Sequence, residues 1–171
     1  FYPGPGVGGH CIPVDPYYLA AKAREFDFHA RFIELAATGN DSMPYYVVSR
    51  TMSALGTRGK RLAGARTLIL GVAYKKDISD VRESPALKLM ELLEKRGAEV
   101  TYHDPHVPQL TLTNPGGQLT STPLTDDTLA AVDCVIIATD HSAVDYERII
   151  AKAPLIIDTR NVLRGTNDPD V

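Results

Sequence analysis

The sequence predicts an α/β fold in which a parallel sheet follows a loop and a long helical segment. Four short runs of apolar and β-branched residues have the length of buried strands, at residues 67–72, 99–103, 132–139 and 155–158. Helical patterns lie between several of them, which indicates a parallel sheet covered by helices on both faces. Ahead of these runs, residues 1–16 are rich in Gly and Pro and residues 17–56 carry good helix formers. The sheet domain is therefore expected to be Rossmann-like.

The composition is that of an ordinary globular protein. Hydrophobic residues make up 44% of the 171 residues and charged residues 23%, and no apolar run approaches the roughly 20 residues that cross a bilayer. The net charge of −3 gives no reason to expect binding to nucleic acid or membranes. Cys11 and Cys134 are too few for a disulfide framework; Cys134 lies in an apolar run and is expected in the core, in a cytoplasmic setting. Because the chain begins with Phe1 inside a loop-type sequence, we expect a piece of a longer protein.

The helical segment is expected to contain a break. Good helix formers fill residues 17–38, and the polar stretch at residues 39–42 predicts a break or a cap. Pro44 is tolerated in the first turn of a helix, so a second helix is expected to begin there and to end near Gly56. Residues 59–64 then form a basic linker to the sheet domain.

Capping and turn residues place the elements of the second half. Ser84 followed by Pro85 predicts the start of a helix, and Gly97 predicts its end. Residues 104–122 are long and polar and are expected to form a loop. Two further helices are expected at residues 126–131 and 143–153.

A glycine-rich stretch near the start has a nucleotide-binding spacing without its context. Residues 4–9 match the pattern G-x-G-x-x-G, which in dinucleotide sites follows a strand and opens directly into a helix. Here only two aromatic residues and a proline precede it, and Pro13 and Pro16 follow too soon for an immediate helix. We therefore interpret these glycines as a loop whose bare backbone lies close to a ligand.

A second loop, after the run at residues 67–72, is rich in cations. Lys75, Lys76 and Arg82 follow the end of a predicted strand, where doubly wound sheets bind their ligands. These side chains could meet a phosphate through charge rather than through glycine amides. The alternative is a solvated charge cluster, because three acidic residues are interleaved with the cations.

Four segments of the chain resemble signatures of one enzyme family. Residues 4–19 resemble the catalytic-cysteine segment of the UDP-glucose/GDP-mannose dehydrogenase family, and residues 74–85 resemble its second signature. Residues 102–105 and 158–161 resemble a third and a fourth, and the four stand in family order. The first segment is similar to that of members acting on UDP-N-acetylhexosamines, such as UDP-N-acetylmannosamine and UDP-N-acetylglucosamine 6-dehydrogenases.

The resemblance implies a two-step oxidation in which Cys11 is the nucleophile. Family members oxidise the C6 alcohol of the sugar to a carboxylate with two hydride transfers to NAD. A cysteine thiolate adds to the intermediate aldehyde, the thiohemiacetal loses the second hydride, and the thioester is hydrolysed. Asp15 matches the carboxylate that handles the hydrolytic water; alternatively, it caps the following helix. His10 either pairs with Cys11 or points away from it, and the second arrangement is favoured.

By the same resemblance, several residues contact the bound nucleotides. Lys75, with Tyr74 beside it, matches a lysine that binds the substrate diphosphate or sugar. Arg82 matches an arginine that reaches the pyrophosphate of NAD across a domain cleft, where its planar group suits phosphate oxygens. Arg160 either lies near the nucleotide or is an ordinary surface arginine. The loop residues expected to line the substrate are Tyr2, Gly4 and Gly8.

The resemblance also divides the chain. Residues 1–16 correspond to the catalytic-cysteine loop, residues 17–56 to a central helical segment through which two subunits pair as a homodimer, and residues 64–171 to a UDP-sugar-binding domain. The NAD-binding domain of such enzymes is not in this sequence, so the chain is expected to be inactive alone, and no metal site is expected. The apolar residues expected at the subunit contact are Phe32, Ile33, Leu35, Ala36, Val47, Val48, Met52 and Leu55.

Three other functions are compatible with parts of the sequence. The chain could belong to a UDP-glucose 6-dehydrogenase, which differs in the sugar alone. It could be a UDP-sugar-binding module without chemistry, although such a module would not keep a cysteine in its first loop. It could also be a thiol enzyme of another class that uses Cys11 and His10 without NAD, and the other three signatures argue against this.

Overall fold

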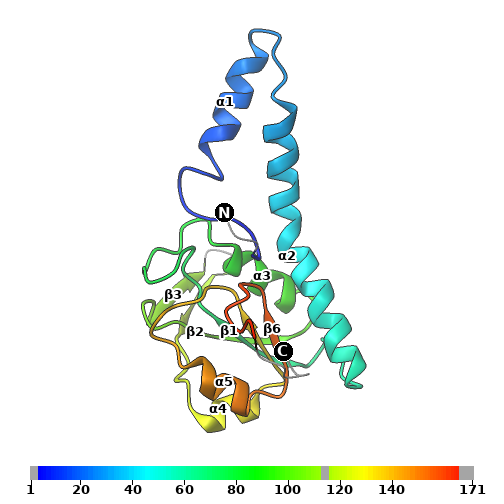
Figure 1. Cartoon of the computed structure of the whole chain (residues 1–171), viewed down its shortest axis with the longest axis vertical. Helices are drawn as coiled ribbons and strands as arrows, with labels where there is room; N and C mark the ends of the chain where they lie inside the picture. The colour runs from blue at the N-terminus through cyan, green and yellow to red at the C-terminus, as the bar shows by residue number, and fades with distance from the viewer. Residues whose placement is uncertain (1–3, 113–115, 166–171) are drawn as a thin grey trace.

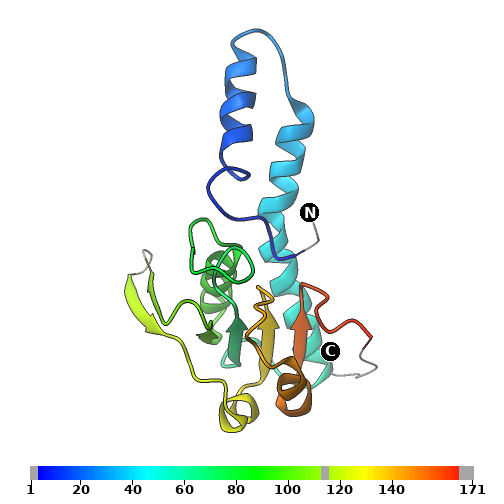
Figure 2. The ribbon, with the colours of Figure 1, turned by 60° about the vertical axis from the view of Figure 1, so that its left-hand side comes forward.

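The computed structural model, which describes residues 4–112 and 116–165, consists of a sheet domain and a helical arm (Figure 1). The arm is formed by α1 (Asp15–Arg24) and by the first half of α2 (Arg31–Thr57). These two helices lie side by side and extend away from the sheet in both views (Figures 1 and 2). No helix within residues 4–112 and 116–165 is both long and apolar enough to cross a membrane.

The break in the helical segment lies elsewhere than predicted. The stretch at residues 39–42 neither breaks nor caps a helix, because α2 is helical from Arg31 to Thr57 with Pro44 in its interior. The chain instead reverses at residues 25–30, where Asp27 has a φ of 58°. Packing explains the difference: the second half of α2 buries Val48 and Leu55 in the core, which stabilises a helix that local propensity alone would interrupt.

The sheet is the predicted parallel one. Its strand order is β2-β1-β5-β6, and each neighbouring pair is parallel. The strands are β1 (Arg66–Leu70), β2 (Glu99–His103), β5 (Cys134–Ile137) and β6 (Ile156–Asp158). The helices of the domain are α3 (Pro85–Glu94), α4 (Asp126–Ala131) and α5 (Tyr146–Lys152).

Side chains alternate along β1 between two separate cores. Ile69 packs with residues of α2 and α3, such as Leu89, whereas Leu68 and Leu70 pack on the opposite face with residues of α4 and α5. Helices therefore cover both faces, as the sequence predicted. Cys134 is buried in the first core, and burial raises the pKa of its thiol to about 12, which leaves it an inert apolar residue.

The predicted start of α3 is confirmed, whereas the helix ends at Glu94, before the predicted stop at Gly97, and the predicted loop at residues 104–122 is partly wrong. Ser84 caps α3 by accepting a hydrogen bond from the Ala86 N–H at 3.3 Å. Between β2 and α4 the chain forms an antiparallel hairpin of β3 (Gln109–Leu112) and β4 (Gly117–Thr120). The hairpin is anchored because Leu110 is buried and the Tyr102 hydroxyl donates to the Val107 carbonyl at 3.0 Å.

The carboxyl ends of the strands are drawn together at one edge of the sheet. Gly71, directly after β1, has a φ of 78°, and a Cβ at this position would lie 2.4 Å from the carbonyl oxygen of Thr139, which follows β5. Only glycine permits this backbone and this approach. The Thr139 hydroxyl also donates to the Ala73 carbonyl at 2.7 Å. The loops that follow β1 and β5 are thus held against each other.

Candidate active site

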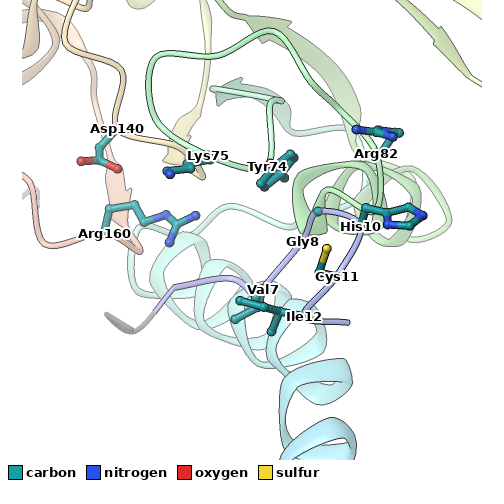
Figure 3. Close-up of a pocket in the computed structure, with 12 residues that line it drawn as sticks. Val7, Gly8, His10, Cys11, Ile12, Tyr74, Lys75, Arg82, Asp140 and Arg160 are labelled. Carbon is teal, nitrogen blue, oxygen red and sulfur yellow. The ribbon is translucent and has the colours of Figure 1, made fainter. Parts of the chain in front are cut away.

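A cavity of about 850 Å³ opens between the carboxyl edge of the sheet and the glycine-rich loop (Figure 3). Of the nine predicted site residues, six line it, and they come from segments up to about 150 residues apart in the sequence. Gly4 lies beside the cavity against Arg160, Asp15 does not line it, and Tyr2 lies outside the described residues. The lining residues are Gly6, Val7, Gly8, Gly9, His10, Cys11, Ile12, Tyr74, Lys75, Arg82, Asp140 and Arg160.

The cavity lies at the point where the sheet changes its direction of winding. The chain passes from β1 to β2 on one side, and from β5 to β6 on the other side. The connections that leave β1 and β5 therefore run to opposite sides of the sheet, and ligands of open α/β sheets bind in the crevice at such a point. Lys75 follows β1 and Asp140 follows β5, and both line the cavity.

Lys75 and Arg160 are the two cations best placed to bind an anion. The Lys75 side chain is exposed, and no carboxylate in the described part of the chain pairs with it. Arg160 is half-buried and held in place, because its Nε donates to the Ala138 carbonyl at 2.7 Å. Burial lowers the pKa of this guanidinium from its high ordinary value. In Figure 3 both side chains lie on one side of the cavity, and Cys11 lies on the other.

The lack of a side chain at Gly4 leaves room for Arg160 to reach the cavity. A Cβ at Gly4 would lie 2.5 Å from Nη1 of Arg160, so a side chain here would displace the guanidinium. The N–H of Arg160 donates to the Asp158 carboxylate at 2.9 Å, which fixes the backbone at the end of β6. Arg160 is therefore not a freely solvated surface arginine.

The Lys75 loop, residues 71–84 between β1 and α3, contains two other cations, and both are paired. Arg82 makes a bidentate contact with Asp80, with Nη2–Oδ2 at 2.7 Å and Nε–Oδ1 at 3.1 Å. Hydrogen bonding to Asp80 raises the pKa of the exposed Arg82 guanidinium. Lys76 lies 3.7 Å from Asp140. The alternative of an interleaved charge cluster thus holds for Lys76 and Arg82 but not for Lys75.

The glycine-rich loop presents Cys11 as an exposed free thiol. The Gly9 N–H donates to the Arg82 carbonyl at 3.1 Å, and a Cβ at Gly8 would lie 2.4 Å from the Glu83 carbonyl oxygen. The glycine-rich loop therefore lies directly on the Lys75 loop. Their backbones approach so closely that only glycine, which has no side chain, fits at the contact. The His10 ring points away from the sulfur of Cys11 (Figure 3), and no hydrogen bond joins the two residues.

Asp15 lies in the first turn of α1, outside the cavity. The N-cap of α1 is Val14, which has no side-chain cap, so Asp15 is not the cap that the sequence allowed as an alternative. Its N–H donates to the Cys11 carbonyl at 2.8 Å, which connects the loop to the helix. Its carboxylate is exposed and can interact with the positive end of the helix dipole.

A buried network behind the Lys75 loop was not predicted. Asp104, at the end of β2, is buried and accepts hydrogen bonds from the N–H groups of Val72 at 2.7 Å and Ala73 at 3.1 Å. It also accepts from His106 N–H at 2.8 Å and from His141 Nε2 at 3.1 Å. Burial disfavours the charge of Asp104, but these donors outweigh burial and lower its pKa to about 2.

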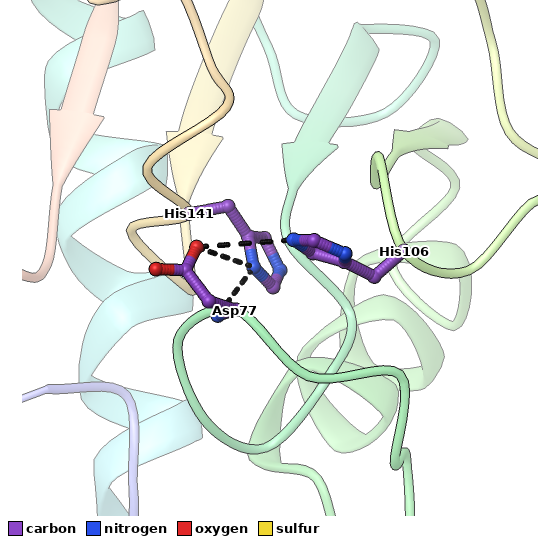
Figure 4. Close-up of side chains that lie close together, drawn as sticks. All are labelled: Asp77, His106 and His141. Atoms are coloured by element: carbon purple, nitrogen blue, oxygen red, sulfur yellow. Dashed lines mark hydrogen bonds and ion pairs between the residues drawn. The ribbon is translucent and has the colours of Figure 1, made fainter.

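His141 connects Asp104 to the Lys75 loop by a hydrogen bond on each side of its ring (Figure 4). The Asp77 N–H donates to Nδ1 of His141 at 3.0 Å, so Nδ1 carries no proton and Nε2 donates to Asp104. The Asp77 carboxylate accepts in turn from the Ser142 N–H at 2.7 Å and from its hydroxyl at 2.8 Å. His106 completes a potential metal-ligand cluster with Asp77 and His141, but both ring nitrogens of His141 are already hydrogen-bonded.

Two family models match the chain. The model of the UDP-glucose/GDP-mannose dehydrogenase family, UDP binding domain, covers residues 68–165, and that of the family's central domain covers residues 1–42. The chain belongs to the UDP-glucose/GDP-mannose dehydrogenase family. This dehydrogenase family was the one suggested by the four sequence signatures, so that prediction is confirmed.

Similar proteins in this family come from archaea and bacteria. The chain is 34% identical over 169 residues to a UDP-N-acetyl-D-mannosamine dehydrogenase of Methanococcus vannielii, covering 94% of this chain and 36% of that protein. It is 35% identical over 145 residues to the enzyme of the same name from Escherichia coli K12, covering 82% and 33%. A solved UDP-D-ManNAc dehydrogenase from Pyrococcus horikoshii has a TM-score of 0.81 and 31% identity, covering 98% of this chain and 38% of that one. The chain thus spans little more than a third of such dehydrogenases.

The family matches coincide with the two sides of the cavity. The UDP binding domain contains β1, β5 and β6, whose loops carry Lys75, Asp140 and Arg160. The central domain contains the loop with Cys11 and the arm helix α1. The cavity therefore lies where these two parts of the dehydrogenase family fold meet.

Proposed function

We propose that the chain is the C-terminal part of an NAD-dependent UDP-sugar 6-dehydrogenase that makes precursors for polysaccharides, and that its cavity binds the UDP-sugar. The observation that carries this proposal is the position of Cys11 in the same cavity as Lys75 and Arg160. The names of the similar proteins favour a UDP-N-acetylhexosamine over UDP-glucose as the substrate.

The two cations account for binding of the diphosphate. Lys75 contributes a compact point charge, and Arg160 contributes N–H groups of a planar guanidinium whose Nε is already fixed by Ala138. Tyr74 and the backbone of Gly8 line the space between them and Cys11, where the sugar would lie. With the diphosphate held at one side, the sugar C6 can reach the sulfur at the other.

NAD is proposed to contact this chain only at the rim of the cavity. The glycine-rich loop is not a dinucleotide loop, because it lies on the Lys75 loop and leads to α1 through a turn at residues 12–14. Arg82 is proposed to contact the pyrophosphate of NAD, by exchanging part of its pairing with Asp80. When bound by the rest of the enzyme, NAD supplies the two oxidations, that of the alcohol and that of the cysteine adduct.

Cys11 supplies the covalent step. Its thiolate adds to the C6 aldehyde to form a thiohemiacetal; oxidation gives a thioester; water then attacks the carbonyl, and the C–S bond breaks to release the carboxylate and the thiolate. For Asp15, the proposed role of base toward this water rests on the family resemblance alone.

The arm supports the proposal of a homodimer, with a narrower contact than the sequence predicted. Val47, Val48 and Leu55 are buried in the chain's own core and are not available to a partner. Phe32 is 87% exposed and Leu35 is 68% exposed, both on the outer half of α2. A second copy of the chain that pairs through this outer half would cover these side chains.

Titration calorimetry with UDP tests the proposed binding site. The 171-residue chain should bind UDP, and Lys75→Ala should weaken the affinity by about 10- to 100-fold, since a hydrogen bond to a charged group contributes roughly 1.5–3 kcal/mol. Lys95→Ala is the matched control, because Lys95 pairs with Glu91 on α3, away from the cavity. Cys11→Ser should leave UDP affinity unchanged but abolish carboxylate formation in the complete enzyme. Absence of UDP binding, or equal weakening by both lysine variants, would contradict the proposal.

A further inference from the structure

Asn40, in the middle of α2, holds the backbone of the glycine-rich loop. Its Oδ1 accepts a hydrogen bond from the Val7 N–H at 2.7 Å, and its Nδ2 donates to the Val7 carbonyl at 3.4 Å. One side-chain amide thus satisfies both polar groups of one loop residue. The pairing also fixes the orientation of the amide, because the Val7 N–H requires an oxygen and the carbonyl requires a donor.

This contact lies behind the cavity rather than inside it. Val7 lines both the cavity that contains Cys11 and a groove between α1 and α2, whereas Asn40 lines that groove and not the cavity. Asn40 is therefore not placed to touch a ligand next to Cys11. It reaches the loop from the arm, four residues before the cysteine.

On its other side the loop is held by the sheet domain. Gly9 donates to the Arg82 carbonyl at 3.1 Å, and a Cβ at Gly6 would lie 2.9 Å from the Pro85 side chain. The Gly9 hydrogen bond keeps the loop from moving away from the sheet domain, and the close packing at Gly6 leaves it no room to move nearer. The pairing with Asn40 keeps the loop from moving away from α2, so the two sets of contacts together define one position for the loop.

Local preference gives no reason for an asparagine at this point of α2. Asn is a poor helix former, since its side chain competes with the backbone for hydrogen bonds. Here the side chain makes its two hydrogen bonds to Val7, at a sequence separation of 33 residues. The residue type is explained by the loop rather than by the helix.

We infer that Asn40 is a positioning residue for Cys11: through Val7 it holds the loop at the distance from Lys75 and Arg160 at which the sulfur meets the sugar C6. The inference rests on the proposed function, since it assigns Asn40 to the same site. An amide is required for both contacts. Aspartate would keep the acceptor for the Val7 N–H but would place an oxygen against the Val7 carbonyl.

The test measures the loop and the phosphate site separately. Amide exchange of Val7, followed by NMR, reports the contact itself and needs no ligand. The rate at which iodoacetamide alkylates Cys11, with and without saturating UDP-N-acetylglucosamine, reports whether the sulfur lies beside the sugar. The affinity for UDP reports the phosphate site. The variants are Asn40→Ala, Asn40→Asp and the control Ser42→Ala, whose hydroxyl bonds only to its own helix at Gly39.

In Asn40→Ala, Val7 exchange should rise and the protection of Cys11 by the sugar nucleotide should fall, each by about fivefold or more, as loss of roughly 1 kcal/mol implies. UDP affinity should stay within about twofold, because Lys75 and Arg160 are untouched. Asn40→Asp should keep the Val7 amide protected and still lose part of the Cys11 protection, and it replaces Asn40→Ala if that variant does not fold.

Unchanged Val7 exchange in Asn40→Ala, or an equal effect of Ser42→Ala, would overturn the inference. Unchanged Cys11 protection in Asn40→Ala despite faster Val7 exchange would overturn it as well. If the unmodified chain binds no UDP, the proposed function fails instead, and the Val7 exchange still decides whether Asn40 holds the loop.

Discussion

Asp104 and His141 form a fully buried pair, with Nε2 of the ring 3.1 Å from Oδ2 of the carboxylate. The pair joins the end of β2 to the loop after β5, and the opposite ring nitrogen of His141 accepts the Asp77 N–H of the Lys75 loop. A single carboxylate thereby fixes three loops around the cavity. Its charge state should matter to the stability of the whole edge of the sheet.

The first prediction concerns acid stability. The folded pKa of Asp104 is about 2, below the ordinary aspartate pKa of about 3.9, so the unfolded state binds its proton more readily. Its contribution to the free energy of unfolding is therefore complete above about pH 4 and is lost as the pH falls toward 2, with a size on the order of 2 kcal/mol. Urea unfolding between pH 2 and pH 7 should show this loss.

Asp104→Asn should remove that part of the pH dependence and lower the free energy of unfolding at pH 7 by about 2–3 kcal/mol. Asp27→Asn is the control, because Asp27 is exposed in the turn between α1 and α2 and asparagine accepts its positive φ. A variant as stable as the unmodified chain at pH 7 would show that the buried carboxylate is not needed.

The second prediction compares two glycines. Gly71→Ala should destabilise the chain by at least about 2 kcal/mol, because its φ is positive and the new methyl would meet the Thr139 carbonyl. Gly39→Ala should instead stabilise it by about 0.5–1 kcal/mol, since Gly39 is helical and a Cβ there meets open space. Thermal unfolding of both variants checks the signs; a stabilising Gly71→Ala would contradict the close approach of β1 and β5.

The third prediction separates charge from geometry at Arg160. Arg160→Lys keeps the positive charge but loses the Nε hydrogen bond to Ala138 and the planar group, so UDP affinity should fall by about tenfold. Arg148→Lys is the matched control, since Arg148 pairs with Asp126 between α4 and α5. Calorimetry with UDP measures both variants. Equal affinity of Arg160→Lys and the unmodified chain would indicate that charge alone suffices.

The fourth prediction concerns the arm. If two copies pair through its outer half, Phe32→Glu combined with Leu35→Glu should convert a dimer to a monomer in light scattering at micromolar concentration. Folding should persist, because both side chains are exposed in the single chain. Thr57→Glu, at the exposed far end of α2, should leave the dimer intact. A dimer that survives the double substitution would place the contact elsewhere.

Elements with strong local signals were predictable from the sequence. The limits of β2 and α4 agree with the predicted ones, and α3 begins at the Ser84–Pro85 cap because both residues fix the backbone locally. The hairpin of β3 and β4 was missed because its strands are only four residues long and mostly exposed. The continuity of α2 was missed because it depends on core packing by Val48 and Leu55, which outweighs Gly39 and Pro44.

The site was predictable where residues lie in recognisable segments. Cys11, Lys75 and Arg160 belong to three different signatures, and the fold brings them to one cavity. Asn40 and His141 escaped prediction because their roles consist of contacts with residues 33 and 37 positions away, to which no local pattern points. Asp104 lay inside a signature, but nothing in the sequence indicated that its carboxylate would be buried.

Helix α2 also fixes the distance and direction between the loop contact and the core contact. Asn40 faces the loop and Val47 faces the core, seven residues apart on a helix of 27 residues. Each helical residue turns the chain by about 100° and advances it by about 1.5 Å. Deleting one residue between these two positions would swing the amide to another side of the helix, and inserting four would restore its direction but carry it about 6 Å along the axis, out of reach of Val7. The two contacts therefore fix the number of residues between Asn40 and Val47.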